Sequence, residues 1–244
     1  MVELRDVHKS YTSDKETVKG ISFKVEDGII YGLLGPNGAG KTTTMQMIST
    51  LLKPTSGEII IDGLKADTDL LEIHKRIGYL TTEIKLDPIS TPEKLWFFFA
   101  SLYDIDVKEA AQRKNVIFNR LGIGPFEKKR IVELSTGMKQ KVSIAISLIH
   151  NPPVIIFDEP TNGLDILTSK QVTDYLLELK NEGHSIILST HIFSVAEALC
   201  DRIGILVDGR IVAEGSVEEL VALTNAKNFE DAFFKLYVEH HVEE

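Results

Sequence analysis

The stretch Gly35-Pro36-Asn37-Gly38-Ala39-Gly40-Lys41-Thr42-Thr43 decides the fold of this chain. A glycine, four residues and then Gly-Lys-Thr is the pattern of a phosphate-binding loop. Glycines let the backbone wrap a polyphosphate closely, so that successive N–H groups point at its oxygens. Lys41 can reach the β and γ phosphates, and the Thr42 hydroxyl can bind Mg²⁺. We therefore predict that the whole stretch binds the polyphosphate of a nucleotide.

The residues on either side of the loop predict the two elements that such a loop connects. Ile29 to Leu34 is an apolar strand that leads into it, and Thr43 to Leu52 is predicted to form the helix that follows. The helix directs the positive end of its dipole at the same anion. An incidental glycine-rich turn would not need both elements.

A second buried strand supplies acidic residues. Val154 to Phe157 is an uninterrupted apolar run, typical of a central parallel strand, and it ends in Asp158 and Glu159. Asp158 is suited to coordinate Mg²⁺, and Glu159 could accept a proton from an attacking water. His191 follows the apolar strand Ser185 to Thr190 and could hydrogen-bond the γ phosphate at the same sheet edge. The alternative for these side chains is a purely structural role.

A further motif, Leu134-Ser135-Thr136-Gly137-Met138, precedes an apolar helix. Ser135 is the predicted helix cap, and the first N–H groups of this helix form a second anion site. This second site has no lysine, which suggests that it serves a nucleotide held by another copy of the chain.

Composition limits the possible classes of protein. The 244 residues are 43% hydrophobic, enough for one large domain or for a core with an attached subdomain. The 27 Lys and Arg against 36 Asp and Glu give a net charge of -9, which argues against electrostatic binding to nucleic acid or an anionic membrane. The single cysteine, Cys200, cannot form an internal disulfide.

Membrane segments and signals are not expected. Residues 1–6 alternate as a strand does and do not resemble a secretory signal, so we expect a cytosolic protein. The most apolar helix candidate, Leu95 to Leu102, is far shorter than the ~20 residues that span a bilayer. If a membrane is involved, another chain must form the channel.

The chain order predicts an α/β architecture. Residues 2–34 are predicted to form a small antiparallel region with a hairpin turn at Asp27-Gly28, and Tyr11 is placed in the loop before this hairpin. There its ring could stack on a nucleotide base or cap the small sheet. Helices predicted at 92–103, 107–121 and 136–149 form a helical insert, and the later strand and helix alternation predicts a parallel sheet with helices on both faces.

The C-terminal region is predicted to be helical. Ser216 and Glu219 form a capping box, and a short helix follows at about residues 229–237. His240 and His241 are interpreted as a frayed tail in preference to a metal site. The predicted domains are thus 1–225, with the helical insert at about 84–150, and a C-terminal helix and tail at 226–244.

These motifs together resemble the ATP-binding subunits of ABC transporters, over nearly the full length of the chain. Gly35 to Thr43 resembles the Walker A loop of that family, and Val154 to Asp158 resembles its Walker B strand. The other motifs that match are the signature at Leu134 to Met138, the catalytic glutamate at Glu159, the D-loop at Asn162 to Asp165, the switch histidine at His191 and the adenine-stacking aromatic at Tyr11.

The resemblance implies a P-loop ABC ATPase fold, with a parallel-sheet core, an N-terminal antiparallel β subdomain and an inserted helical subdomain. It also implies that two subunits close head to tail over two MgATP. Ser135, Gly137 and Asp165 would then contact ATP held by the other subunit. Closure would do work on integral membrane permease subunits, with this chain peripheral at the cytoplasmic face of the cell membrane.

Two departures from the family pattern stand out. The signature has Thr136 and Met138 where the family usually has glycine and glutamine. The Q-loop glutamine is replaced by Thr82, which is followed by Glu83, and either could reach Mg²⁺ through water. This stretch, the signature and the aromatic run Trp96 to Phe99 resemble the ATPases of bacterial sodium-extruding exporters, although drug and peptide exporters share much of the pattern.

Three alternatives stay open. The aromatic run Trp96 to Phe99 is either part of the permease grip or ordinary core of the helical insert. An ABC-type ATPase acting on nucleic acid or ribosomes is disfavoured by the negative charge and by the lack of sustained heptads or an internal repeat. A regulator that binds nucleotide without hydrolysing it is disfavoured by the presence of Asp158, Glu159 and His191.

Overall fold

A mostly parallel sheet forms the centre of the molecule in the computed structural model, which describes residues 1–12, 15–81 and 85–241. Its six strands follow the order β10-β9-β3-β8-β7-β6 over these residues. All neighbours run parallel except β10, which pairs antiparallel with β9. The strands are β3 (Ile30–Leu34), β6 (Ile77–Leu80), β7 (Val154–Asp158), β8 (Ser185–Thr190), β9 (Arg202–Val207) and β10 (Arg210–Gly215).

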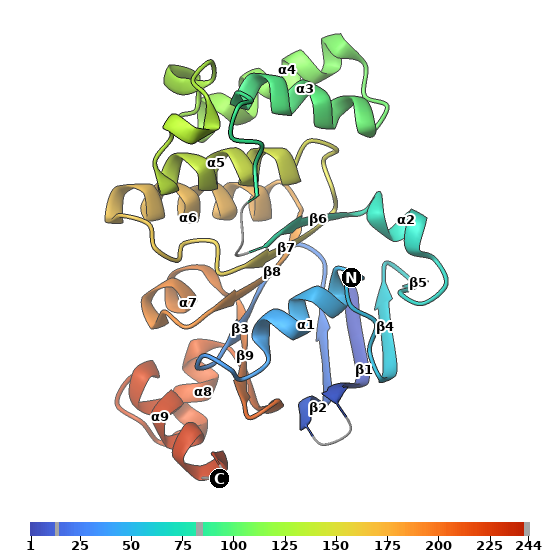
Figure 1. The fold of residues 1–244 in the computed structure, drawn as a ribbon. Coiled ribbons are helices and arrows are strands. Elements are labelled where there is room, and N and C mark those ends of the chain that lie inside the picture. The colour runs from blue at the N-terminus through green and yellow to red at the C-terminus, as the bar shows by residue number, and fades with distance from the viewer. Residues whose placement is uncertain (13–14, 82–84, 242–244) are drawn as a thin grey trace.

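An antiparallel sheet packs beside this core (Figure 1). In the described residues its order is β2-β1-β4-β5. Its strands are β1 (Val2–Thr12), β2 (Lys15–Val25), β4 (Ser56–Ile61) and β5 (Leu64–Lys65).

The predicted hairpin at Asp27-Gly28 is wrong. The turn exists, with Gly28 at a φ of 71°, but it connects β2 of the antiparallel sheet to β3 of the parallel sheet. Every residue of β3 is buried, so the strand is apolar on both sides and belongs between β9 and β8 in the core. Tyr11 was predicted in a loop, but it lies within the longer strand β1.

Alternate residues of the core strands face two different helical layers. In β7, Ile155 and Phe157 pack in the cluster that holds the helical insert, whereas Val154 and Ile156 pack on the side of α1. Helix α1 (Lys41–Ile48) covers one face, and α5 (Thr136–Ser147), α6 (Ile166–Asn181) and α7 (Phe193–Leu199) lie on the other. Figure 1 shows both layers, which confirms the predicted parallel sheet with helices on both faces.

The helical insert stands at one end of the core (Figure 1). Before it, the short helix α2 (Leu70–His74) precedes β6. The elements of the insert are α3 (Pro92–Leu102), α4 (Val107–Arg120), the single 3₁₀ turns η1 (Gly124–Phe126) and η2 (Ile131–Glu133), and α5. Thr91 caps α3 by accepting the Lys94 N–H at 3.3 Å, as the Thr-Pro pair predicts.

The aromatic run of α3 divides between core and surface. Trp96 is fully buried, and its indole N–H donates to the Ala110 carbonyl at 2.8 Å. Its ring meets Phe118 edge-on, with centroids 5.5 Å apart. Phe98 is 56% exposed. The interpretation as core of the insert is therefore correct for Trp96. Phe98 is the exposed residue of the run, so it is the one that another chain could contact.

Two helices end the chain, α8 (Val217–Thr224) and α9 (Phe229–His240). The predicted capping box is present, because Ser216 accepts the Glu219 N–H while the Glu219 carboxylate accepts the Ser216 N–H. The frayed tail predicted at His240 and His241 is wrong. His240 is the last residue of α9, and the His241 ring stacks on Tyr237 with centroids 4.6 Å apart.

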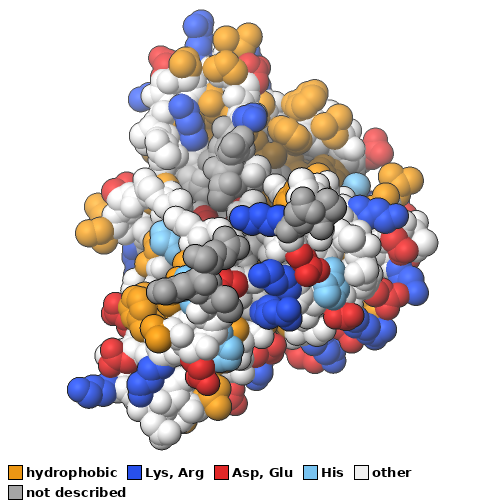
Figure 2. Space-filling model, turned by 60° about the horizontal axis from the view of Figure 1, so that its bottom comes forward, with side chains coloured by type: hydrophobic (Ala, Val, Ile, Leu, Met, Phe, Trp, Pro, Cys, Tyr) orange, Lys and Arg blue, Asp and Glu red, His pale blue; other side chains and the backbone are white. Residues whose placement is uncertain are grey.

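The surface is mixed in charge. Figure 2 shows acidic and basic side chains interspersed over one face. None of the helices in the described part of the chain has the length and hydropathy that crossing a bilayer requires.

We predict that Trp96→Ala destabilises the protein by about 3–5 kcal/mol, because it removes a large buried ring and leaves the Ala110 carbonyl without its donor. Phe98→Ala, on the same helix but half-exposed, should change stability by no more than about 0.5 kcal/mol. Denaturant unfolding of both variants measures the difference. Equal losses would show that the insert core is not organised around Trp96.

Candidate active site

The phosphate loop is fixed by the close approach of its first glycine to strand β9. A Cβ atom on Gly35 would lie 2.3 Å from the Leu206 carbonyl oxygen, so no larger residue fits without moving β9. Two further glycines bend the loop with positive φ, 85° at Gly38 and 107° at Gly40. The loop therefore leads directly into the N-terminus of α1, whose first N–H groups favour an anion.

Lys41, the first residue of α1, lies folded against the loop. Its ammonium group donates to the carbonyl oxygens of Gly35 at 2.8 Å and Pro36 at 3.2 Å. The same nitrogen is 3.5 Å from the Glu159 carboxylate. The lysine thus stands between the phosphate loop and the predicted catalytic glutamate, where it can exchange these contacts for phosphate oxygens.

Asp158 ends β7 next to the loop and is fully buried. The Ser189 hydroxyl donates to its Oδ1 at 2.5 Å, while Oδ2 is buried without a partner among the described residues. Burial raises the pKa of the Asp158 carboxyl, and the Ser189 hydrogen bond and the nearby Thr42 hydroxyl oppose the rise. A buried carboxylate close to a threonine hydroxyl offers the oxygen ligands that a hard cation prefers, so the residues present fit Mg²⁺.

Glu159 follows directly in an uncommon backbone conformation, with a φ of 52°. Its N–H donates to the Ser189 hydroxyl at 3.0 Å, so that Ser189 links the backbone of Glu159 to the side chain of Asp158. The carboxylate of Glu159 lies 2.9 and 3.0 Å from Nδ1 of His191. Lys41, Glu159 and His191 therefore form a continuous row of charged and polar groups.

One cleft of about 430 Å³ contains this row. Residues of the phosphate loop and the start of α1 line it together with Glu159, Asn162 and His191. The predicted phosphate-binding and catalytic residues, distant in sequence, are thus brought to one place at the carboxyl ends of parallel strands.

Tyr11 also reaches the phosphate loop helix. Its hydroxyl lies 3.3 Å from the Thr43 hydroxyl, and the Lys9 ammonium is 5.7 Å from its ring centroid. The ring is 57% exposed. This placement leaves an aromatic surface beside the loop on which a base can stack.

Three other predicted residues lie away from the cleft. Ser135 caps α5 by accepting the Met138 N–H at 3.3 Å, as predicted, and Asp165 caps α6 by accepting the Thr168 N–H at 3.0 Å. Gly137 packs against Thr168, which lies 3.0 Å from the position of a Cβ on that glycine. In the described structure none of the three predicted residues lines the cleft. They belong to an exposed surface formed by the starts of two helices.

Two predicted metal-site residues, Thr82 and Glu83, lie outside the described residues. Conversely, sequence reasoning missed Ser189 and Thr17, the latter a lining residue of the cleft, and it named Asn162, which also lines the cleft, only as the start of the D-loop. Ser189 is the register partner of Asp158 on the adjacent parallel strand. Its signal was its place near the end of a strand beside the acidic one, but the sequence does not say which strands are neighbours.

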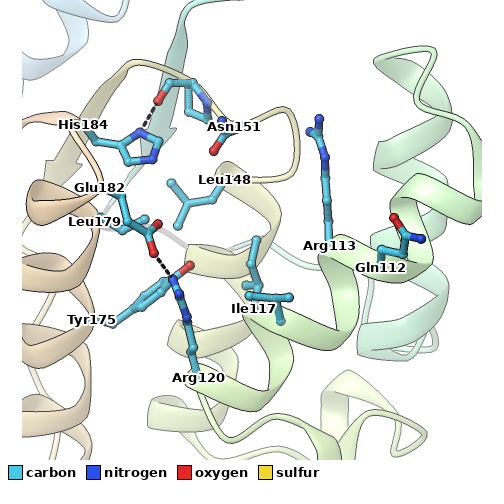
Figure 3. A pocket seen from close by; sticks show the side chains of 12 residues that line it. Gln112, Arg113, Ile117, Arg120, Leu148, Asn151, Tyr175, Leu179, Glu182 and His184 are labelled. Carbon is cyan, nitrogen blue, oxygen red and sulfur yellow. Dashed lines mark hydrogen bonds and ion pairs between the residues drawn. The ribbon is translucent and has the colours of Figure 1, made fainter.

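A second cavity, of about 330 Å³, lies at the seam between the helical insert and the core (Figure 3). Ile117 and Leu148 face Tyr175 and Leu179 of α6 across it. Its charged groups pair with one another or with neighbours; Arg120, for example, lies 2.6 Å from Glu182. This cavity shares no lining residue with the phosphate cleft. Its lining comes from both the helical insert and the core.

Comparison with known proteins agrees with this geometry. The family model described as ABC transporter matches residues 18–162. The ABC transporter ATP-binding protein NatA of Bacillus subtilis is 37% identical over 90% of this chain and 91% of its own length. The linearmycin resistance ATP-binding protein LnrL of the same organism is 35% identical over 90% of this chain and 70% of its own.

Solved structures show the same fold. An ATP-binding subunit of an ABC transporter superimposes with a TM-score of 0.89 and 28% identity, covering 97% of this chain and 99% of that one. The cassette MJ0796, in a dimeric post-hydrolysis state with ADP and Pi, gives a TM-score of 0.81 and 29% identity over 88% of this chain and 98% of its own. With the phosphate loop, the acidic strand end and the histidine in one cleft, this chain belongs to the ATP-binding ATPase family of ABC transporters.

Proposed function

We propose that this chain powers export through separate membrane permease subunits, with two copies of the ATPase domain closing head to tail over two ATP molecules. The proposal rests on one observation: the residues predicted to contact ATP lie in two separate places on the chain's surface. The cleft is lined by residues of the phosphate loop, Glu159 and His191, whereas the exposed Ser135 and the half-buried Gly137 lie outside it. A second copy facing the cleft would supply those two residues to the nucleotide.

Export is favoured by the names of the relatives. They include NatA, linearmycin and daunorubicin resistance proteins, and Nod factor export proteins. Sodium is the first substrate to test, because NatA is among these relatives and the sequence motifs resemble those of sodium exporters. A drug or peptide substrate is the alternative.

The site residues divide the proposed chemistry among them. The loop N–H groups and Lys41 bind the phosphates, and Tyr11 stacks on the base. Thr42 and Asp158 would hold Mg²⁺, which supplies charge neutralisation at the phosphates when bound. Glu159 takes the proton of the attacking water, and a positioned base contributes about 10² to 10⁴ in rate.

His191 and Ser189 keep this arrangement in place. The imidazole contacts the Glu159 carboxylate and lines the cleft, where it would contact the γ phosphate of bound ATP. Ser189 fixes both acidic residues through one hydroxyl group. Asp165 caps α6 and would reach the nucleotide only through the closed dimer.

The partner proposal is tested by purifying a tagged form of the chain from its native host in mild detergent. Recovery of a polytopic membrane protein supports the exporter, and that complex in liposomes with a sodium-sensitive dye then tests Na⁺ as the substrate. Recovery of ribosomes, nucleic acid or only soluble proteins, under every detergent tried, would overturn the exporter proposal.

We predict that Glu159→Gln lowers ATP turnover at least about 10²-fold, because the amide cannot accept the proton, while ATP binding is kept. Without hydrolysis the ATP-bound dimer should persist and elute as a dimer in size-exclusion chromatography with MgATP. Glu178→Gln, an exposed carboxylate on α6, is the matched control. An unchanged ATPase rate in Glu159→Gln would remove the assigned base.

We also predict that Ser189→Ala lowers kcat about tenfold with a KM for ATP within about twofold, because it removes both hydrogen bonds of the hydroxyl that Asp158 and Glu159 share, so that their geometry loosens. Ser143→Ala is the control: its hydroxyl is buried and has no partner among the described residues. Steady-state ATPase assays compare the two. Equal effects would mean that the loss in Ser189→Ala reflects packing alone.

A further inference from the structure

The C-terminal helix α9 lies against the segment that follows His191. Phe193 is the first residue of α7, two residues beyond the histidine. Its ring centroid lies 5.1 Å from that of Phe233 and 6.1 Å from that of Phe229, with the ring planes at 67° and 86°. A third ring, Phe234, is 6.0 Å away. Edge-on aromatic contacts at these distances are attractive and directional.

Few local features hold this segment by themselves. Helix α7 has seven residues, and its N-cap residue Ile192 provides no side-chain cap. A helix this short depends on tertiary contacts for its stability. The Ile192 N–H donates to the Thr190 hydroxyl at 3.0 Å, and the His191 side chain is 38% exposed. Ile192, next to the histidine, packs against the main core cluster, and Phe193 is the next apolar residue, whose ring packs against α9.

Helix α9 is a rigid support because both of its ends are fixed. Phe229 and Leu236 are buried in one apolar cluster with Leu34, the residue before the phosphate loop. At the other end, His241 lies 2.9 Å from the Asp208 carboxylate in the β9–β10 turn. Figure 1 shows α8 and α9 together at the C-terminal end of the molecule, beside α7.

The turn that receives His241 also touches the phosphate loop. Gly209, the residue after Asp208, donates its N–H to the Ala39 carbonyl at 3.1 Å. Helix α9 thus contacts the supports of both sides of the cleft, the phosphate loop through the β9–β10 turn and the histidine segment through Phe193.

We propose that Phe193 is a positioning residue for ATP hydrolysis, which holds His191 at the cleft by packing against α9. The inference rests on the proposed role of His191. It assigns a function to the C-terminal helix, which contributes no residue to the cleft in the described structure. Because an active-site displacement of ~1 Å can cost about 10² in rate, a looser histidine segment should affect turnover more than nucleotide binding.

The test compares Phe193→Ala, Phe193→Tyr and Val238→Ala in steady-state ATPase assays. Phe193→Ala should lower kcat about tenfold and leave the KM for ATP within about twofold, because the ring contacts to α9 are lost. Phe193→Tyr keeps the ring and should restore most of the rate. Val238, on α9 but 76% exposed, is the control. A normal kcat in Phe193→Ala would overturn the inference.

A double-mutant cycle shows whether the effect passes through His191. Single-turnover hydrolysis of labelled ATP is measured for His191→Ala, Phe193→Ala and the double variant, so that slow rates remain measurable. If Phe193 acts through the histidine, the double variant should be no slower than His191→Ala. An equal further loss in the double variant would show that Phe193 acts elsewhere.

Two outcomes separate the inference from the function on which it rests. If His191→Ala hydrolyses ATP at the normal rate, the proposed role of His191 fails and the inference fails with it. If His191→Ala is slow but Phe193→Ala is normal, only the inference fails. Should Phe193→Ala not fold, Phe193→Leu removes the ring contacts while keeping an apolar side chain, and the same cycle applies.

Discussion

The two hydrogen bonds of the Ser189 hydroxyl link the parallel sheet to both acidic residues of the proposed active site. Strands β7 and β8 run parallel with Asp158 opposite Ser189, and this register brings a hydroxyl group within reach of both acidic residues. Parallel strands end at the same edge, so β3 delivers the phosphate loop to the place where β7 delivers the carboxylates. A shift of one residue in this register would move each side chain to the opposite face of the sheet.

The energetic cost of this arrangement is concentrated at the strand end. Asp158 is buried, which raises the pKa of its carboxyl, and Glu159 has a positive φ that few non-glycine residues adopt. Both are tolerated because the surrounding core is rigid: apolar side chains pack on both faces of β7. The scaffold thereby holds charged groups in a geometry that a short peptide would not keep.

The predicted site residues fall into two groups, those gathered in the cleft of one copy and those proposed to act on the nucleotide of a second copy. The cleft holds the predicted phosphate-binding residues and the proposed base within one copy, whereas the capping residues of α5 and α6 do not line this cleft in the described structure. A separate cavity lies at the seam between the insert and the core (Figure 3). The arrangement explains why a dimer and a membrane partner belong to the proposed cycle.

The sequence by itself determined the phosphate loop, the acidic strand end, the capping residues Thr91, Ser135 and Ser216, and the parallel core with its helical insert. These features depend on local conformation and on hydrophobic period, which neighbouring residues encode. Only the tertiary structure decided that β3 leaves the antiparallel sheet, that Ser189 stands beside Asp158, and that α9 supports Phe193. Strand order and helix docking depend on contacts between residues far apart in the chain. The local hydrophobic pattern does not specify which distant segments pair.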